Sequence, residues 1–188
     1  MYSTFYNTLF WGFILVIIDI RIGGFSILPD FIGFILIYNA LVTLARQHEA
    51  YDKAKPFALF LIFLSLPHIY ETPGQNLLAN PLTGQSLPML LWDQIYLLLL
   101  LILLYYIYRA VSGLAKERGQ EDLANYSISV WQFYLVLTGI LLASTPFMLT
   151  LLIDKAGFYL IIIILQFVSF VFFIHLIHRA RLELSLQE

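Results

Sequence analysis

The sequence predicts an all-α polytopic integral membrane protein with six transmembrane helices arranged as three tandem helical hairpins. Its composition, the spacing of its apolar runs and the distribution of its basic residues predict this class. Of 188 residues, 61% are hydrophobic and only 12% are charged, and the mean hydropathy is +0.85. A soluble domain carries about 25% charged residues, so this chain is expected to lie in a bilayer.

Six apolar runs are the candidate spans. They are Phe5–Ile20, Phe31–Ala45, Phe57–Ile69, Leu87–Tyr108, Val130–Ile153 and Gly157–Ile177. Several are shorter than the roughly 20 residues that cross a bilayer perpendicularly, so interfacial residues must lengthen them. Pro67 and His68 interrupt the third run, but it extends backwards through Ala50, Tyr51 and Ala54. The first run has no basic region before it and no small-residue cleavage site after it, which predicts a retained helix rather than a signal peptide.

The basic residues predict the orientation, because Lys and Arg concentrate on the cytoplasmic side of a membrane. With six spans, eight of the ten fall on one side: Arg46, Lys53, Lys55, Arg109, Lys116, Arg118, Arg179 and Arg181. Only Arg21 and Lys155 fall on the other. We therefore expect both termini in the cytoplasm, with Lys53 and Arg118 inside and Thr83 outside.

Internal similarity supports the hairpin arrangement. WGFILV at Trp11–Val16 matches WQFYLV at Trp131–Val136, and DFIGFILI at Asp30–Ile37 matches DKAGFYLI at Asp154–Ile161. A fainter copy, DQIYLLLL, begins at Asp93. These matches predict one transmembrane domain, residues 1–188, whose hairpins cover about 4–48, 50–112 and 128–179. The outer pair is clearly similar and the middle hairpin less so.

Three carboxylates occupy corresponding positions in this scheme. Asp30, Asp93 and Asp154 would each lie at the outer N-terminus of the second helix of a hairpin, where a carboxylate caps backbone N–H groups and meets the positive end of the helix dipole. Alternatively, they rim an outward-facing cavity together with Asp19 and Glu71. Those five acids against Arg21 and Lys155 give the outer face a net charge of −3. Such a face favours cations.

Asp19 directly follows an apolar run, so it could lie inside the hydrocarbon. A carboxylate there is costly unless it is paired, protonated or facing water. Arg21 cannot face it on a helix, because residues two apart do not meet, so pairing requires either that the helix ends by Ile20 or a different partner such as Asp30. One interpretation is an ion pair that tethers the first hairpin, and the other is a proton-linked or ion-linked site. The candidate binding residues are therefore Asp19, Arg21, Asp30, Asp93 and Asp154.

Other polar residues fall within or beside the predicted helices. Asn39, Gln132 and Gln166 are expected to hydrogen-bond between helices. His175 and His178 are three residues apart near the inner end of the last run. Histidines on adjacent helical turns can ligate a metal, but we prefer a place among the lipid headgroups and expect no metal and no other cofactor.

Two connecting segments stand out. Tyr70–Pro88 is the longest outer connection and is rich in proline, which fits either a lid or a plain connector. Ser112–Tyr126 is polar and is expected to be a short linker between the second and third hairpins.

Several functions are excluded by what the sequence lacks. It has no cysteine, so it can form neither a disulfide nor a thiolate site. It contains no catalytic signature and no nucleotide-binding loop. A net charge of −2 without a long basic tract argues against nucleic acid as a partner.

The first 60 residues resemble a family. The segment WGFILVIIDIRIGGFSILPDFIGFILIYNAL, followed by KAKPFAL, resembles the opening of small, poorly characterised six-helix membrane proteins of Gram-positive bacteria that carry an LPDFIG-like segment. The most distinctive positions are Trp11, Asp19, Leu28, Pro29, Asp30, Phe31, Ile32, Gly33, Lys55 and Pro56. The resemblance implies a bacterial cytoplasmic membrane and brings no activity with it.

Three functional classes stay open at this point. We favour binding or transport of a small solute or ion, with a cationic one preferred because of the acidic outer face. The alternative is a non-catalytic subunit of a larger membrane complex, and the third class is an intramembrane enzyme acting on lipid. We expect no enzymatic activity. The expected partners are membrane lipids and either another protein or a second copy of this chain.

Overall fold

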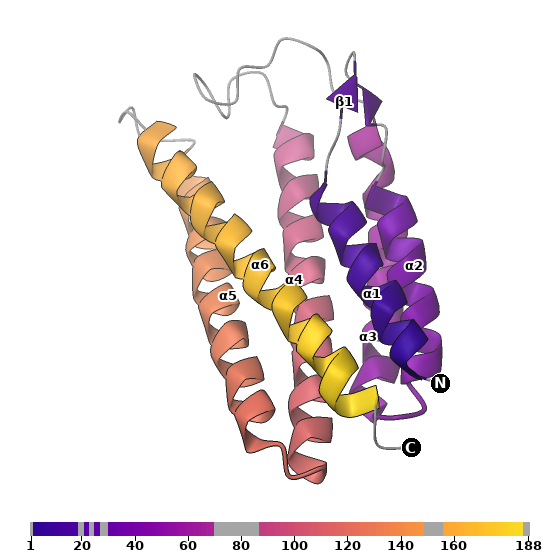
Figure 1. Cartoon of the computed structure of the whole chain (residues 1–188). Coiled ribbons are helices and arrows are strands. Elements are labelled where there is room, and N and C mark those ends of the chain that lie inside the picture. The colour runs from indigo at the N-terminus through magenta and orange to yellow at the C-terminus, as the bar shows by residue number, and fades with distance from the viewer. Residues whose placement is uncertain are drawn as a thin grey trace.

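The protein is a bundle of helices in the computed structural model, which describes residues 2–18, 21–22, 25–26, 30–69, 87–148 and 156–185 (Figure 1). The described part contains six α-helices, one 3-10 turn and one pair of two-residue strands. In chain order they are α1 (Tyr2–Ile17), β1 (Arg21–Ile22), β2 (Phe25–Ser26), α2 (Asp30–Leu44), α3 (Glu49–Leu64), η1 (Leu66–Ile69), α4 (Leu87–Glu117), α5 (Glu121–Met148) and α6 (Ala156–Ser185). The all-helical prediction is therefore confirmed for this part of the chain.

The helices form a closed ring. Each helix packs against the next one along the chain, and α6 returns to pack against α1. The pairs α1–α2, α3–α4 and α5–α6 lie side by side, but α2–α3 and α4–α5 do so as well. The three expected hairpins are thus joined continuously within one bundle.

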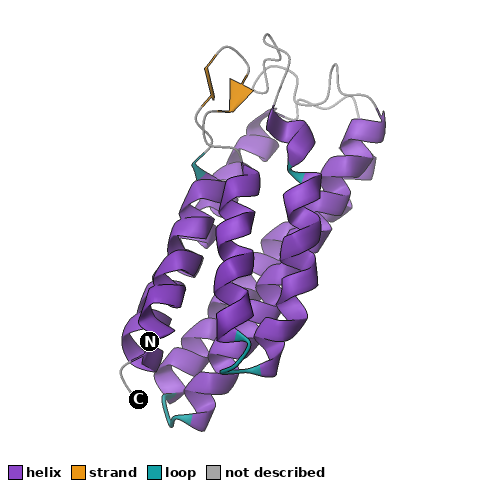
Figure 2. Ribbon diagram, turned by 90° about the vertical axis from the view of Figure 1, so that its right-hand side faces the viewer, coloured by secondary structure: helices purple, strands orange, loops and turns teal. Residues whose placement is uncertain are grey.

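The two ends of the bundle differ in charge. Figures 1 and 2 show that the start of α1, the end of α6 and the α2–α3 and α4–α5 turns lie at one end, and that β1 and β2 lie at the other. We call these the basic end and the strand end. The eight Lys and Arg residues predicted to share one side all belong to the elements that meet at the basic end. β1 and β2 pair antiparallel at the strand end, with Ile22 opposite Phe25.

The helices differ in length between the two halves of the chain. α4, α5 and α6 have 31, 28 and 30 residues, and each is long and apolar enough to cross a membrane by length and composition. α1, α2 and α3 have only 16, 15 and 16 residues. The structure therefore supports a membrane protein with three candidate spans in its described part, and the prediction of six spans is confirmed only in part.

The prediction of a linker over Ser112–Tyr126 is wrong. α4 continues to Glu117 and α5 begins at Glu121, so only three residues separate the helices. Gly119 ends α4 with a φ of +70°, while its N–H donates to the Lys116 carbonyl at 3.1 Å and the Gln120 N–H donates to the Ala115 carbonyl at 2.8 Å. This left-handed glycine cap stops the helix within one residue. The polar residues around it are mostly good helix formers, which explains why a polar stretch is helical here.

The third helix follows its extended prediction. α3 begins at Glu49, as expected if the run extends backwards through Ala50 and Ala54, and it ends at Leu64 before Pro67. His48 caps it, since its Nδ1 accepts a hydrogen bond from the Ala50 N–H at 3.0 Å. The predicted lid or connector at Tyr70–Pro88 falls almost entirely outside the described residues.

Candidate functional site

Asp30 is the first residue of α2, as predicted. Its Oδ2 accepts a hydrogen bond from the Tyr96 hydroxyl of α4 at 3.5 Å, and the Tyr96 ring packs edge-on against Phe34 with centroids 6.0 Å apart. The position at the helix start is confirmed, and the capping of backbone N–H groups stays a prediction. The carboxylate is also a weak acceptor for the Tyr96 hydroxyl, and this contact links α2 with α4.

The other predicted binding residues fall into different situations. Asp93 was expected to cap the fourth helix, but α4 begins at Leu87 and places Asp93 in its second turn, so that prediction is wrong. Asp93 and Asp30 both lie close enough to Tyr96 to act on its hydroxyl, which brings two of the five residues together. Arg21 is described only as backbone of β1. Asp19 and Asp154 lie outside the described residues.

A cavity of about 340 Å³ lies between α1, α4, α5 and α6 in the half of the bundle nearer the strand end. We call it the α1–α6 cavity. It is lined by Val16, Ile17, Tyr96, Leu97, Leu100, Leu141, Ile162, Gln166, Phe167 and Phe170. Its volume is typical of small-molecule sites, which are mainly apolar with a few polar groups. Tyr96 and Gln166 supply the polar groups here.

The spread of α6 away from α1 makes room for this cavity. The two helices touch at the basic end, where Arg181 Nη1 donates to Asn7 Oδ1 at 2.9 Å, and again where the rings of Phe13 and Phe173 pack edge-on at 4.6 Å. Beyond Phe13 the helices diverge towards the strand end, as Figure 1 shows. Phe167 lines the cavity with 58% of its surface exposed, so the cavity reaches the flank of the bundle that would face lipid.

Buried polar atoms on α5 and α6 lie on and beside this cavity. Gln166 Nε2 donates to Thr138 Oγ1 at 3.4 Å, but Gln166 Oε1 has no hydrogen-bond partner among the described residues. The Ser169 hydroxyl is likewise buried without a partner in that part of the chain. The Tyr134 hydroxyl is buried close to the Thr138 and Gln166 side chains, but it makes no hydrogen bond of good geometry among the described residues. Tyr134 packs on Phe170 of the cavity wall at 5.6 Å. An unsatisfied buried polar group costs about 1–3 kcal/mol, so such atoms in one place need a functional or structural explanation.

Only one of the three predicted interhelical amides makes such a bond. Gln166 does, but Asn39 and Gln132 are exposed, so the prediction is wrong for both. An apolar helix in a membrane gives no one-dimensional signal of which face packs, because both faces are hydrophobic. His175 and His178 are also exposed and diverge, since one ring lies beside Tyr126 of α5 and the other beside Phe10 of α1.

The basic end is closed by polar contacts between distant segments. The Tyr6 hydroxyl donates to Gln47 Oε1 at 3.1 Å and lies 3.2 Å from the Tyr51 hydroxyl. Arg118 donates to the Leu184 carbonyl, and Gln120 Nε2 donates to the Glu183 carbonyl at 3.2 Å. These bonds join α1, α3, the α4–α5 turn and α6 across this end of the bundle.

The surface of the basic end carries exposed ion pairs. Lys53 Nζ lies 2.7 Å from Glu49 Oε1, and Lys55 Nζ lies 2.5 Å from Asp52 Oδ1. The hydrogen bond and positive charge of Lys53 lower the pKa of Glu49. These pairs add little stability, because exposed charges are well screened.

Comparison of the chain with protein-family models, with curated proteins and with solved structures found no match. The resemblance to small membrane proteins of Gram-positive bacteria therefore stays a prediction. Function has to be inferred from the residues of this chain.

Sequence reasoning missed Tyr96 and the cavity. The available signal was local: Tyr96 follows Asp93 by three residues, which places both on one helix face. Gln166 was singled out, but its role on a cavity wall depends on the divergence of α6 from α1. That divergence results from helix packing, and it cannot be predicted from the sequence of either helix alone.

Proposed function

We propose that this protein binds a small, mainly apolar solute with one polar group in the α1–α6 cavity. The observation that carries the proposal is Gln166, which lines a cavity of about 340 Å³ and whose buried Oε1 has no hydrogen-bond partner among the described residues. A solute with a donor group would complete that bond, while its apolar body would contact Leu97, Leu100 and Ile162. A hydrogen bond from the solute to this unpaired oxygen would add specificity as well as affinity.

A cationic polar group is favoured over an anionic one. Asp30 and Asp93 both lie close to Tyr96, which forms part of the cavity wall. Carboxylates near a site of low dielectric raise the local concentration of cations and oppose anions. The proposed solute class is therefore an amphipathic amine or ammonium compound.

Binding fits the geometry better than a continuous pathway. The cavity lies towards the strand end, whereas the basic end is joined by the Tyr6, Gln47 and Tyr51 side chains and by the Arg118 bond to α6. A solute would enter from the strand end or from the lipid between α1 and α6. Exposure of Phe167 at that flank supports the lateral route.

The proposed setting is a bacterial cytoplasmic membrane crossed six times, with both termini in the cytoplasm. Eight of ten Lys and Arg residues belong to the elements at one end of the bundle, which supports placing that end inside. The shorter helices α1, α2 and α3 would cross with help from residues that flank them.

A matched series of probes tests the binding proposal. Hexylammonium, hexan-1-ol and hexanoate share an apolar tail and differ in the charge of the head. We expect hexylammonium to raise the unfolding temperature of the purified protein most and hexanoate least. In Gln166→Leu the affinity for hexylammonium should fall about tenfold, because one hydrogen bond is lost. That variant removes the unpaired Oε1 but also the hydrogen bond to the buried Thr138 hydroxyl, so its own stability should stay within about 1 kcal/mol of the wild type.

Gln132→Leu is the control, because it makes the same chemical change at an exposed position of the neighbouring helix. It should keep the wild-type affinity for hexylammonium. Equal losses in Gln132→Leu and Gln166→Leu, or no stabilisation of the wild type by any of the three probes, would rule out this site. Tightest binding of hexanoate would refute the preference for cations alone.

A further inference from the structure

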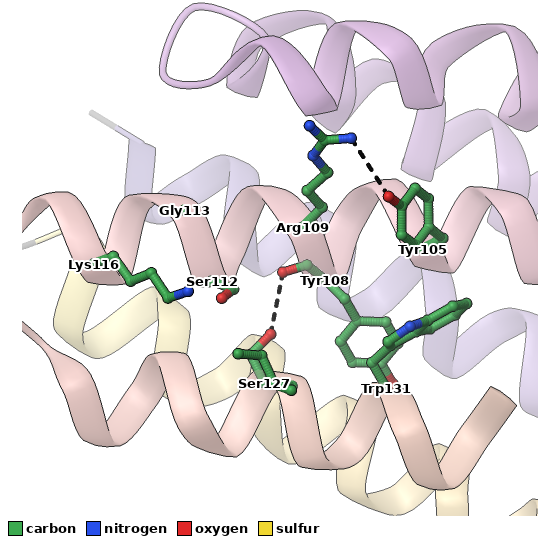
Figure 3. A pocket seen from close by; sticks show the side chains of 9 residues that line it. Tyr105, Tyr108, Arg109, Ser112, Gly113, Lys116, Ser127 and Trp131 are labelled. Carbon is green, nitrogen blue, oxygen red and sulfur yellow. Dashed lines mark hydrogen bonds between the residues drawn. The ribbon is translucent and has the colours of Figure 1, made fainter. Parts of the chain in front are cut away.

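A second cavity, of about 290 Å³, lies between α4 and α5 near the basic end. We call it the α4–α5 groove. It is lined by Tyr105, Tyr108, Arg109, Ser112, Gly113, Lys116, Ser127, Ile128 and Trp131 (Figure 3). The lining contains two cations, two serines and three aromatic residues, and no carboxylate is among these described residues. The proposed solute site uses none of them.

The sequence of α4 places the two cations on one face. Arg109, Ser112 and Lys116 are separated by three and four residues, so they follow one another along the same side of the helix. Figure 3 shows Lys116 and Ser112 along α4, on the side of Ser127 and Trp131 of α5, while the Arg109 side chain extends away from α5 with its guanidinium beside Tyr105. The Ser127 hydroxyl already donates to the Tyr108 carbonyl at 3.1 Å, which fixes α5 against α4.

Neither cation is held by a carboxylate in the described part of the chain. Arg109 Nη1 makes an exposed hydrogen bond of 3.4 Å to the Tyr105 hydroxyl, which is weak at that distance. Glu49 is near Arg109, but its carboxylate pairs with Lys53 at 2.7 Å. Lys116 is exposed. Both side chains can therefore turn towards an anion without breaking an ion pair.

The depth of the groove matches a headgroup layer. The helix rises 1.5 Å per residue, so Arg109 lies about 33 Å along α4 from Leu87, and Lys116 about 10 Å further. The hydrocarbon core of a bilayer is about 30 Å thick. The apolar run of α4 ends at Tyr108, so the two cations would lie among the headgroups at the basic end. Tyr105 and Trp131 pack at 5.4 Å at the apolar side of the groove, where amphipathic rings are favoured.

We propose that the α4–α5 groove binds the phosphate headgroup of an anionic phospholipid from the leaflet at the basic end. Lys116 and Arg109 would contact the phosphate, the Ser112 hydroxyl would donate to it, and the acyl chains would run along Tyr105 and Trp131. Basic pockets between transmembrane helices on the cytoplasmic side have this chemistry. The proposal depends on the membrane setting but not on the proposed solute site, so each can fail without the other.

Fluorescence quenching of Trp131 tests this proposal. The chain has three tryptophans, so Trp11→Phe with Trp92→Phe leaves Trp131 as the only one. The protein is placed in phosphatidylcholine bilayers that contain 20% of a brominated lipid, either phosphatidylglycerol or phosphatidylcholine. We expect brominated phosphatidylglycerol to quench more strongly. Arg109→Gln with Lys116→Gln should reduce this preference by about fivefold for each cation removed, which corresponds to about 1 kcal/mol each.

Lys53→Gln with Lys55→Gln is the control, because it removes the same charge from the same end and both lysines are already ion-paired. It should keep the preference. Equal quenching by both lipids, or an equal loss in the control, would overturn the proposal. If 10 mM inorganic phosphate abolishes the preference, the site takes free phosphate and the lipid assignment is wrong. If the double variant does not fold, Lys116→Gln alone, at an exposed position, should still reduce the preference for brominated phosphatidylglycerol.

Discussion

The hairpins α1–α2 and α5–α6 are similar in sequence but pack in different ways. Gly12 and Gly33 bring α1 and α2 into backbone contact, because a Cβ at Gly33 would lie 2.7 Å from the Gly12 carbonyl oxygen and a Cβ at Gly12 would lie 2.9 Å from that of Gly33. The residue of α5 that aligns with Gly12 is Gln132, and it is exposed. α5 and α6 instead bury Thr138 and Ser169 and partly bury Gln166.

This difference teaches that two apolar helices with matching motifs need not present the same face to their neighbours. Small residues allow close contact through van der Waals packing, which is a main source of helix association in lipid. The first hairpin uses that contact and is tightly packed. The third replaces it with polar side chains. The first hairpin thus contributes Val16 and Ile17 to the wall of the α1–α6 cavity, and the third contributes Gln166, the polar group of the proposed solute site.

The largest expected effect is a difference in cysteine labelling between the two sides of the membrane. It tests whether the short first hairpin crosses the membrane as the long third one is proposed to do. Single cysteines at Ser26, Glu49 and Glu121 can be introduced into this cysteine-free chain. We expect an impermeant thiol reagent to label residue 26 only from outside and residues 49 and 121 only from inside. Labelling of residue 26 from inside would show that α1 and α2 do not cross, and the six-span topology would then be wrong.

The next effect tests the glycine contact of the first hairpin. Gly33→Ala should lower the free energy of unfolding by about 1–3 kcal/mol, because the new methyl group meets backbone that cannot move away as a side chain would. Gly139→Ala in α5 is the matched control, since nothing lies within 4 Å of its added Cβ. The control should be neutral or up to about 1 kcal/mol more stable, through the higher helix propensity of alanine. Unfolding in detergent measures both, and equal stability of Gly33→Ala and wild type would contradict the close contact.

The smallest effect concerns the strand end, where α2 meets α4. Asp30→Ala should lower stability by about 1 kcal/mol, because it removes the carboxylate expected to cap the start of α2 and the acceptor for Tyr96. Asp30→Asn caps as well and keeps an oxygen for Tyr96, so it should lose much less. The same unfolding measurements test this prediction. Tyr96→Phe removes only the hydroxyl that bonds to Asp30, so its effect separates the loss of that hydrogen bond from the loss of the helix cap. If Asp30→Asn is as unstable as Asp30→Ala, the charge itself is needed and capping is not the main role.

The sequence predicts the helices better than it predicts their contacts. The apolar runs predicted the positions of all six helices. The basic residues predicted which helix ends lie together at the end of the bundle that contains Arg118 and Arg181. Helix ends were less certain, as the helical stretch around Gly119 shows, because polar residues can continue a helix beyond the hydrocarbon. The site was only partly found. Asp30 and Gln166 were singled out from the sequence, but the role of Tyr96 depends on how α4 packs against α2, and the cavity depends on how α6 diverges from α1.

The way α6 is attached makes it a lever. Its C-terminal end is bonded to Asn7 of α1 and, through the Leu184 and Glu183 carbonyls, to Arg118 and Gln120 of the α4–α5 turn. Its other end diverges from α1 beyond the Phe13–Phe173 contact. A helix of 30 residues is about 45 Å long, so a rotation of about 5° around the anchored end would displace the other end, together with the part of α5 that packs on it, by about 4 Å. Small changes in the contacts at the basic end would therefore widen or narrow the α1–α6 cavity near the strand end.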